Sequence, residues 1–269
     1  MSTPPEPDPA AIPPMVVRRV GLAAIKGTRH LSLDEVTLDA HGPLGDRVWC
    51  LVDAARLQVV RTVANPLMEL SIEADGESLR VALADGRLVS GRVSASGPPV
   101  EVDYWGRPAL VTPYDGEPAR LLAERIGRPV FLARAARGAV VYGAPVSVVG
   151  TASLQDLAER MGRPEPVLQP ERFRSTLVIE TAEPWVEDGW LGRELVVGEV
   201  VVRVNGRIGR CGVPNQHPLT GRADTPILKA LAGFRPCNEA GEPFLAVDAA
   251  VVRPGTIRPG DPVTLLDTP

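Results

Sequence analysis

The chain has 269 residues, of which 44% are hydrophobic and 23% charged, and its formal net charge is −4. This composition is typical of a soluble globular protein with one large domain or two small ones. The acidic balance argues against nucleic-acid binding, and no segment approaches the roughly 18 apolar residues of a membrane span. With three cysteines and no apolar leader, we expect a cytoplasmic protein without a disulfide framework.

Short runs of β-forming residues follow one another along the chain. Residues 1–14 are rich in proline and acidic residues, so we expect a disordered tail there. The pattern predicts strands at 31–38, 48–52, 59–63, 70–73, 79–83, 100–102, 109–111, 177–180, 195–204, 246–252 and 263–266. Short strands separated by turns predict a barrel or sandwich rather than a parallel sheet covered by helices.

Three amphipathic segments interrupt the strands and predict helices near 117–127, 151–161 and 225–233. The second carries Ser153-x-x-Asp156 at its start. Asp224 is the expected N-cap of the third, with Pro226 in its first turn. The predicted fold class is therefore mainly β (α+β), with few helices.

The segment 208–221 is the most informative for chemistry, since the chain lacks the common hydrolase, metalloprotease and nucleotide-binding motifs. Cys211 lies where a long apolar strand gives way to glycine, proline and polar residues. A thiol at a strand end can be partly exposed, and Arg210 beside it would favour the reactive thiolate. His217 could supply a proton or be a solvated loop residue. On residues alone, Cys211 could also be an inert residue.

Several motifs occur together in a characteristic order, at 42–53, 172–179, 187–193, 210–211, 219–221 and 255–263. Through them the chain resembles the MOSC family, the domain shared with the C-terminal part of molybdenum-cofactor sulfurases. It is most similar to two-part members of the type of the mitochondrial amidoxime-reducing component. The resemblance implies an N-terminal β-barrel part over residues 15–115 and a C-terminal MOSC β-barrel over residues 116–269.

The resemblance also implies a molybdenum cofactor, in which a phosphorylated pterin holds the metal. Cys211 would be the metal ligand and catalytic residue, because a soft thiolate suits this centre. Arg47 and Arg174 would grip the phosphate with their planar guanidinium groups. Lys26 and Arg210 complete the implied cofactor-binding set.

Each of these cations has a plainer alternative. Arg47 can pair with neighbouring Asp46, Arg174 can cap a strand end at the surface, and Lys26 can be a solvated loop residue. Cys50 lies in an apolar run and is expected in the core.

Three functions compete. The resemblance implies a reductase of amidoximes, hydroxamic acids or hydroxylamines that takes its electrons from a separate redox protein. The second is a sulfur carrier or sulfurtransferase with a persulfide on Cys211. The third is a cofactor carrier without turnover. We expect a small-molecule substrate and no nucleic-acid or membrane partner, with loops 135–150 and 212–224 at the mouth of the site.

Overall fold

The computed structural model describes residues 14–62, 66–163 and 169–266. Most of the predicted tail and Val63, the last residue of the predicted strand 59–63, therefore lie outside the described residues. The rest of that prediction is wrong beyond Val59, because the strand there, β6, covers only Gln58–Val59. The α-helices are α1 (Glu117–Ile126), α2 (Thr151–Arg160) and α3 (Ile227–Ala232), which confirms the three expected helices. No helix in the described ranges combines the length and the apolar character needed to cross a bilayer.

An eight-stranded sheet forms the C-terminal lobe. Its order is β15 (Leu177–Ile179), β14 (Val146–Gly150), β18 (Phe244–Arg253), β17 (Val200–Gly209), β16 (Glu194–Val197), β20 (Pro262–Leu265), β1 (Met15–Leu22) and β2 (Leu31–Leu33). An additional pairing of β1 with β15 closes the sheet into a barrel. Its interior is filled mainly by valine, leucine and isoleucine, and Trp190 packs among them.

A six-stranded sheet forms the N-terminal lobe. Its order is β10 (Ser94–Ala95), β12 (Arg107–Asp115), β11 (Val100–Tyr104), β6 (Gln58–Val59), β5 (Trp49–Asp53) and β13 (Val130–Ala135), and a β12–β13 pairing closes it. Helix α1 and a three-stranded sheet of β7 (Ser71–Asp75), β8 (Ser78–Ala82) and β9 (Leu88–Arg92) share one of its hydrophobic clusters. Cys50 is fully buried in β5, as expected. The prediction of a mainly β fold with two barrel parts is confirmed.

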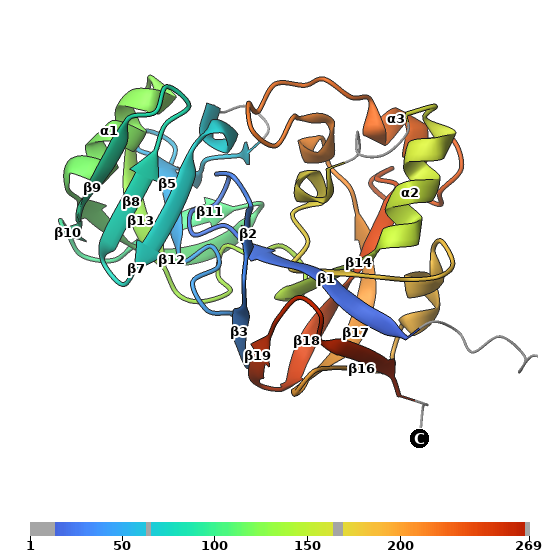
Figure 1. Ribbon diagram of the computed structural model, residues 1–269. Coiled ribbons are helices and arrows are strands. Elements are labelled where there is room, and N and C mark those ends of the chain that lie inside the picture. The colour runs from blue at the N-terminus through green and yellow to red at the C-terminus, as the bar shows by residue number, and fades with distance from the viewer. Residues whose placement is uncertain (1–13, 63–65, 164–168, 267–269) are drawn as a thin grey trace, which may run out of the picture.

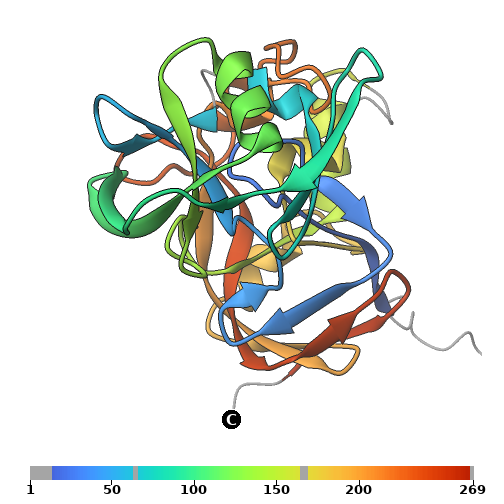
Figure 2. The ribbon, with the colours of Figure 1, turned by 90° about the vertical axis from the view of Figure 1, so that its left-hand side faces the viewer.

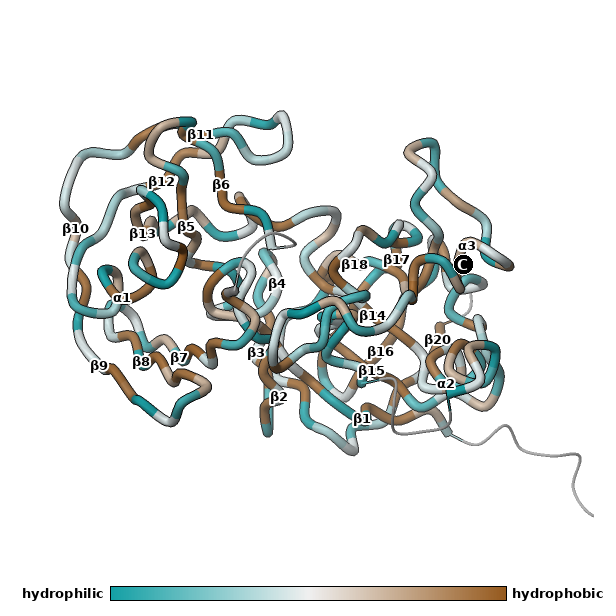
Figure 3. The backbone as a smooth tube through the Cα atoms, turned by 90° about the horizontal axis from the view of Figure 1, so that it is seen from above, coloured by the Kyte–Doolittle hydropathy of each residue, from teal (hydrophilic) through white to brown (hydrophobic). Residues whose placement is uncertain are grey.

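The two lobes lie side by side, and hydrophobic segments run through the strands of both (Figures 1 and 3). A small sheet of β19 (Gly255–Ile257), β3 (Val36–Asp39) and β4 (Gly42–Pro43) completes the strands. Short 3-10 helices occupy Pro66–Glu69 (η2), Pro170–Phe173 (η3), Val186–Trp190 (η4) and Val213–Asn215 (η5).

Strand pairing crosses the predicted boundary between residues 115 and 116 in both directions. Strand β1 pairs with β15 and β20, and β3 pairs with β19. In the turned view, the blue N-terminal strands accordingly lie beside the red C-terminal ones (Figure 2). Conversely, β13 pairs with β5 and β12. The lobes are therefore interlocked through exchanged strands, which cover edges that each part would otherwise expose.

Two predicted strands are each divided in the structure. The stretch 195–204 forms the β16–β17 hairpin, which turns at Gly198 with φ 56°. Valines stand on both sides of Gly198 and Glu199 and hide the turn, because both strands contribute buried residues. The stretch 31–38 likewise divides into β2 and β3, separated by the exposed Asp34 and Glu35.

The predicted cap of the third helix is wrong, and the serine noted near the start of the second helix makes a tertiary contact instead of a cap. The residue before α3 is Pro226 without a side-chain cap, because Asp224 instead binds a buried guanidinium group described below. Helix α2 starts after Gly150, and the Ser153 hydroxyl donates to the buried Glu187 carboxylate at 2.8 Å. In both cases a tertiary contact takes the polar side chain that local capping would have used.

Candidate functional site

A cavity of about 1190 Å³, counting its open mouth, is lined by residues from both lobes. Lys26, Arg47, Arg174, Arg210 and Cys211, the five residues singled out from the sequence, all contribute to its wall. The fold thus brings together side chains from four separate segments of the chain.

Cys211 follows the end of β17 and is exposed, whereas the adjacent Arg210 is buried. The Arg210 guanidinium donates through Nε to the carbonyl of Leu245 at 2.8 Å and through Nη1 to the carbonyl of Phe173 at 3.0 Å. Burial lowers the pKa of Arg210 to about 10, while the Cys211 side chain acts in the opposite direction. Arg210 therefore anchors the backbone that presents Cys211.

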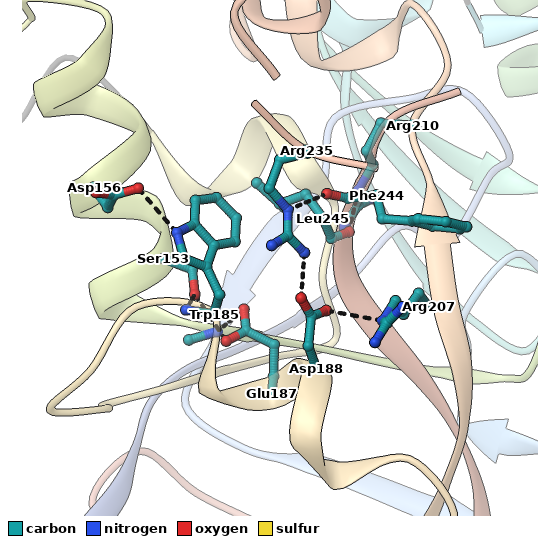
Figure 4. Close-up of polar contacts among 11 residues, drawn as sticks. Ser153, Asp156, Trp185, Glu187, Asp188, Arg207, Arg210, Arg235, Phe244 and Leu245 are labelled. Carbon is teal, nitrogen blue, oxygen red and sulfur yellow. Dashed lines mark hydrogen bonds and ion pairs between the residues drawn. The ribbon is translucent and has the colours of Figure 1, made fainter. Parts of the chain in front are cut away.

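A second guanidinium supports the same stretch of β18 (Figure 4). Arg235 donates to the carbonyl of Phe244 at 3.0 Å and pairs with Asp188 at 2.5 Å. Two consecutive carbonyls of β18 are thus each held by an arginine, Phe244 by Arg235 and Leu245 by Arg210. This network fixes the strand against which the Cys211 segment is anchored.

Three cations converge on the cavity from different elements. Arg47 pairs with Asp46 at 3.2 Å and also lines the cavity. The expected ion pair with Asp46 therefore does not remove Arg47 from the cavity wall. Arg174 is not a surface strand cap: it is half-buried and donates to the Thr28 carbonyl at 2.6 Å. Lys26 is also half-buried, with Nζ 5.0 Å from the ring centroid of Tyr104.

These cations repel one another. Burial, together with Arg47 and Arg174, lowers the pKa of Lys26 to about 7. Burial and Arg47 lower the pKa of Arg174 to about 9. Asp46 offsets part of this effect, and Glu242, the one acidic residue among those lining the cavity, is bonded to an asparagine amide. An anion entering the cavity would relieve both the repulsion and the desolvation.

Sequence reasoning missed several lining residues, and Arg172 and Tyr104 are two of them. Arg172 is buried and binds both carboxylate oxygens of Asp224, at 2.7 and 2.9 Å. Tyr104 is 1% exposed, and its hydroxyl has no hydrogen-bond partner within the described residues. Arg172 lies in one of the quoted motifs and could have been considered, whereas no local pattern marks Tyr104 at the end of β11.

Of the remaining predicted features, the two loops line the cavity and His217 does not. Both loops expected at its mouth contribute, through Tyr142 and Pro145 in one and Val213 and Pro214 in the other. His217 is not among the lining residues, and its Nδ1 accepts from the amide of Leu219 at 3.2 Å. No group of three or more His, Cys, Asp or Glu side chains suited to a metal ion occurs in the described parts of the chain.

Known proteins match parts of this chain. The mitochondrial amidoxime-reducing component 1 of Mus musculus is 33% identical over 129 residues, or 45% of this chain and 36% of the mouse protein. The Homo sapiens protein of the same name is 30% identical over 129 residues, or 45% of this chain and 37% of the human protein. The matched region thus spans little more than a third of these relatives' length.

Among solved structures, the YUAD protein from Bacillus subtilis aligns over 95% of this chain and 97% of its own, with 12% identity and a TM-score of 0.46. YiiM from Geobacillus stearothermophilus aligns over 46% of this chain and 54% of its own, with 23% identity and a TM-score of 0.33. The MOSC domain model matches residues 126–264, a little more than half of the sequence. The chain therefore belongs to the MOSC domain family.

Proposed function

We propose that this protein binds a molybdenum–pterin cofactor in the cavity and reduces N-hydroxylated small molecules, with electrons from a separate redox protein. The observation that carries the proposal is the convergence of the exposed Cys211 with Lys26, Arg47 and Arg174, whose positive charges are only partly balanced. The names of the two amidoxime-reducing relatives support the reaction class.

The residues present fit such a cofactor. Lys26, Arg47 and Arg174 would hold the pterin phosphate, because cations crowded together bind an anion that restores their favoured charged state. The buried hydroxyl of Tyr104 lacks a partner in the described chain and is free to donate to a bound group. Cys211 would be the thiolate ligand of the metal.

When bound, the cofactor would supply two-electron chemistry that accepts the oxygen of an N–O bond. The chain's own contribution is to hold the cofactor and orient the substrate. Reduction of an N-hydroxy group to N–H consumes two electrons and two protons and releases water. A bound phosphate would raise the pKa of Lys26 from about 7 toward its ordinary value, so in the loaded protein Lys26 would hold the phosphate as a cation and the two protons would come from solvent.

The test uses protein purified from a host that makes the cofactor. We expect bound molybdenum and pterin, together with reduction of an N-hydroxylated substrate by an artificial electron donor. Cys211→Ala and Cys211→Ser should lose turnover with little change in melting temperature, because an exposed thiol contributes little to the core. As controls, Cys50→Ala and Cys237→Ala should keep measurable activity, with a stability loss in the buried Cys50 variant.

Near-wild-type turnover in Cys211→Ser would overturn the proposal. A persulfide on Cys211 without metal would favour the sulfur-carrier function, for which the exposed thiol is also suited. Bound metal without turnover of N-hydroxylated compounds would leave a cofactor carrier.

A further inference from the structure

Two exposed aromatic side chains lie at the mouth of the cavity. Aromatic residues make up only 4% of the chain. Trp105 is 47% exposed and Tyr142 is 64% exposed, and both line the cavity. The other large hydrophobic side chains exposed in the described ranges are aliphatic. Exposed aromatic surface concentrated at one cavity indicates a binding role.

The backbone at Trp105 is unfavourable for tryptophan. Trp105 and Gly106 form the two-residue turn between β11 and β12, and their φ angles are 57° and 77°. A turn with two positive φ values favours asparagine followed by glycine, because most L-residues are strained there. Strain that persists at a site is a reason to look for a function of the strained residue. The Arg61 guanidinium also lies 4.4 Å from the indole centroid and lines the cavity.

The loop that carries Tyr142 is tied to the same turn. Arg107, which pairs with Tyr104 across the turn, donates to the carbonyl of Val141 at 3.0 Å. On the other side of Tyr142, the amide of Ala144 donates to an Asp248 carboxylate oxygen at 3.2 Å. The two aromatic residues thus sit on segments that are connected to each other and anchored to the C-terminal barrel.

We propose that Trp105 and Tyr142 form an aromatic clamp that holds a planar aromatic ring of the substrate at the mouth of the cavity. Aromatic rings gain from offset or edge-to-face contacts with other rings, beyond the area they bury. The site should therefore prefer aromatic N-hydroxylated compounds to saturated ones of equal size. This deepens the proposed function and rests on it for the N-hydroxy group, whereas recognition of the ring can be tested separately.

The probes are benzohydroxamic acid and cyclohexanecarbohydroxamic acid, which share the head group and the number of carbon atoms but differ in planarity and π electrons. Their dissociation constants are measured by calorimetry on the protein purified from a host that makes the cofactor, whether or not the cofactor is bound, and their turnover is measured in parallel. We expect the wild type to bind the aromatic probe about tenfold more tightly.

Trp105→Asn is the decisive variant. Asparagine tolerates positive φ and precedes Gly106, so the melting temperature should stay level or rise. The ratio of the dissociation constant of the cyclohexyl probe to that of the aromatic probe should fall close to one. The dissociation constant of the cyclohexyl probe itself should change little. Tyr142→Leu should reduce the preference as well. Leu110→Ala is the matched control, because Leu110 is 61% exposed on β12 but does not line the cavity.

An unchanged preference in Trp105→Asn would overturn the clamp, and so would an equal loss of affinity for both probes. If the clamp behaves as expected in binding but neither probe is reduced, the clamp stands and the proposed reductase function fails. If both probes are reduced without an aromatic preference, the reductase function stands and the clamp fails.

Discussion

Replacing Lys26 by methionine should stabilise the cofactor-free protein at pH 6 and weaken anion binding in the cavity. Methionine has a similar length and no charge. In the structure the Lys26 ammonium is half-buried, feels the repulsion of Arg47 and Arg174, and has no salt bridge to any described residue. The substitution therefore removes a charge that folding places in an unfavourable position.

The magnitude follows from the pKa of Lys26, which is lowered from 10.5 to about 7. At about 1.36 kcal/mol per tenfold change in the proton-binding constant, the charged lysine costs the folded state at most about 5 kcal/mol below pH 7. Between pH 7 and 10.5 the unfolded chain binds more protons than the folded one, so the free energy of unfolding rises with pH across this window. Structural relaxation and water that enters the site reduce this penalty. We therefore expect the free energy of unfolding of Lys26→Met to exceed that of the wild type by about 1 to 3 kcal/mol at pH 6.

Urea unfolding at pH 6, 8 and 9.5 measures the stability, and NMR of protein carrying 13C at lysine Cε measures the pKa. The spectrum is simple because the chain has two lysines. Lys229→Met is the matched control: this lysine is exposed in the last turn of α3, so its loss should change the stability little at any of these pH values. Inorganic phosphate should raise the pKa of Lys26 toward its ordinary value in the wild type.

A Lys26 signal that titrates near 10.5 in the cofactor-free protein would refute the electrostatic reasoning. So would a Lys26→Met variant that is less stable than the wild type at pH 6.

Three further predictions follow from buried polar groups. Tyr104→Phe should leave the melting temperature unchanged or raise it, because a buried hydroxyl without a partner costs about 1 to 3 kcal/mol; metal analysis should show less retained cofactor. Asp224→Ala should cost about 2 to 3 kcal/mol in urea unfolding, because it leaves the guanidinium of Arg172 buried and unpaired, and a loss well below 1 kcal/mol would contradict this. Burial raises the pKa of Cys50 to about 12, so a thiol reagent at pH 8 should label this cysteine only after unfolding, whereas labelling of the native protein would be inconsistent with its position.

The sequence was a good guide wherever a local pattern determines the structure. Helix α1 follows from its amphipathic spacing, and it ends at Gly127, which adopts the left-handed conformation common at helix C-termini. The position of Cys211 after the end of β17 also follows from a local change of composition. In these cases neighbouring residues carry the whole signal.

Features that depend on long-range pairing could not be read in the same way. Tyr104 and Trp105 reach the cavity because their hairpin lies beside a loop that is distant in the sequence: Arg107 donates to the carbonyl of Val141, 34 positions further along the chain. The ion pair between Arg172 and Asp224 joins positions 52 residues apart and removes a helix cap that local rules had assigned. Such contacts depend on how distant segments pair in the fold, and local patterns in a single sequence do not predict that pairing.

The place of β1 in the C-terminal barrel has a consequence for how the protein is made. Met15 pairs with Val263, 248 positions further along the chain. At about 5 to 20 residues per second, a ribosome needs tens of seconds between these two residues, and during that time β1 lacks its final neighbour. Barrel closure is then a late step with a high cost in loop entropy, which favours slow folding. A fragment restricted to residues 126–264 would have no β1 to lie between β15 and β20, so the region that defines the family by sequence would leave both of those edges uncovered.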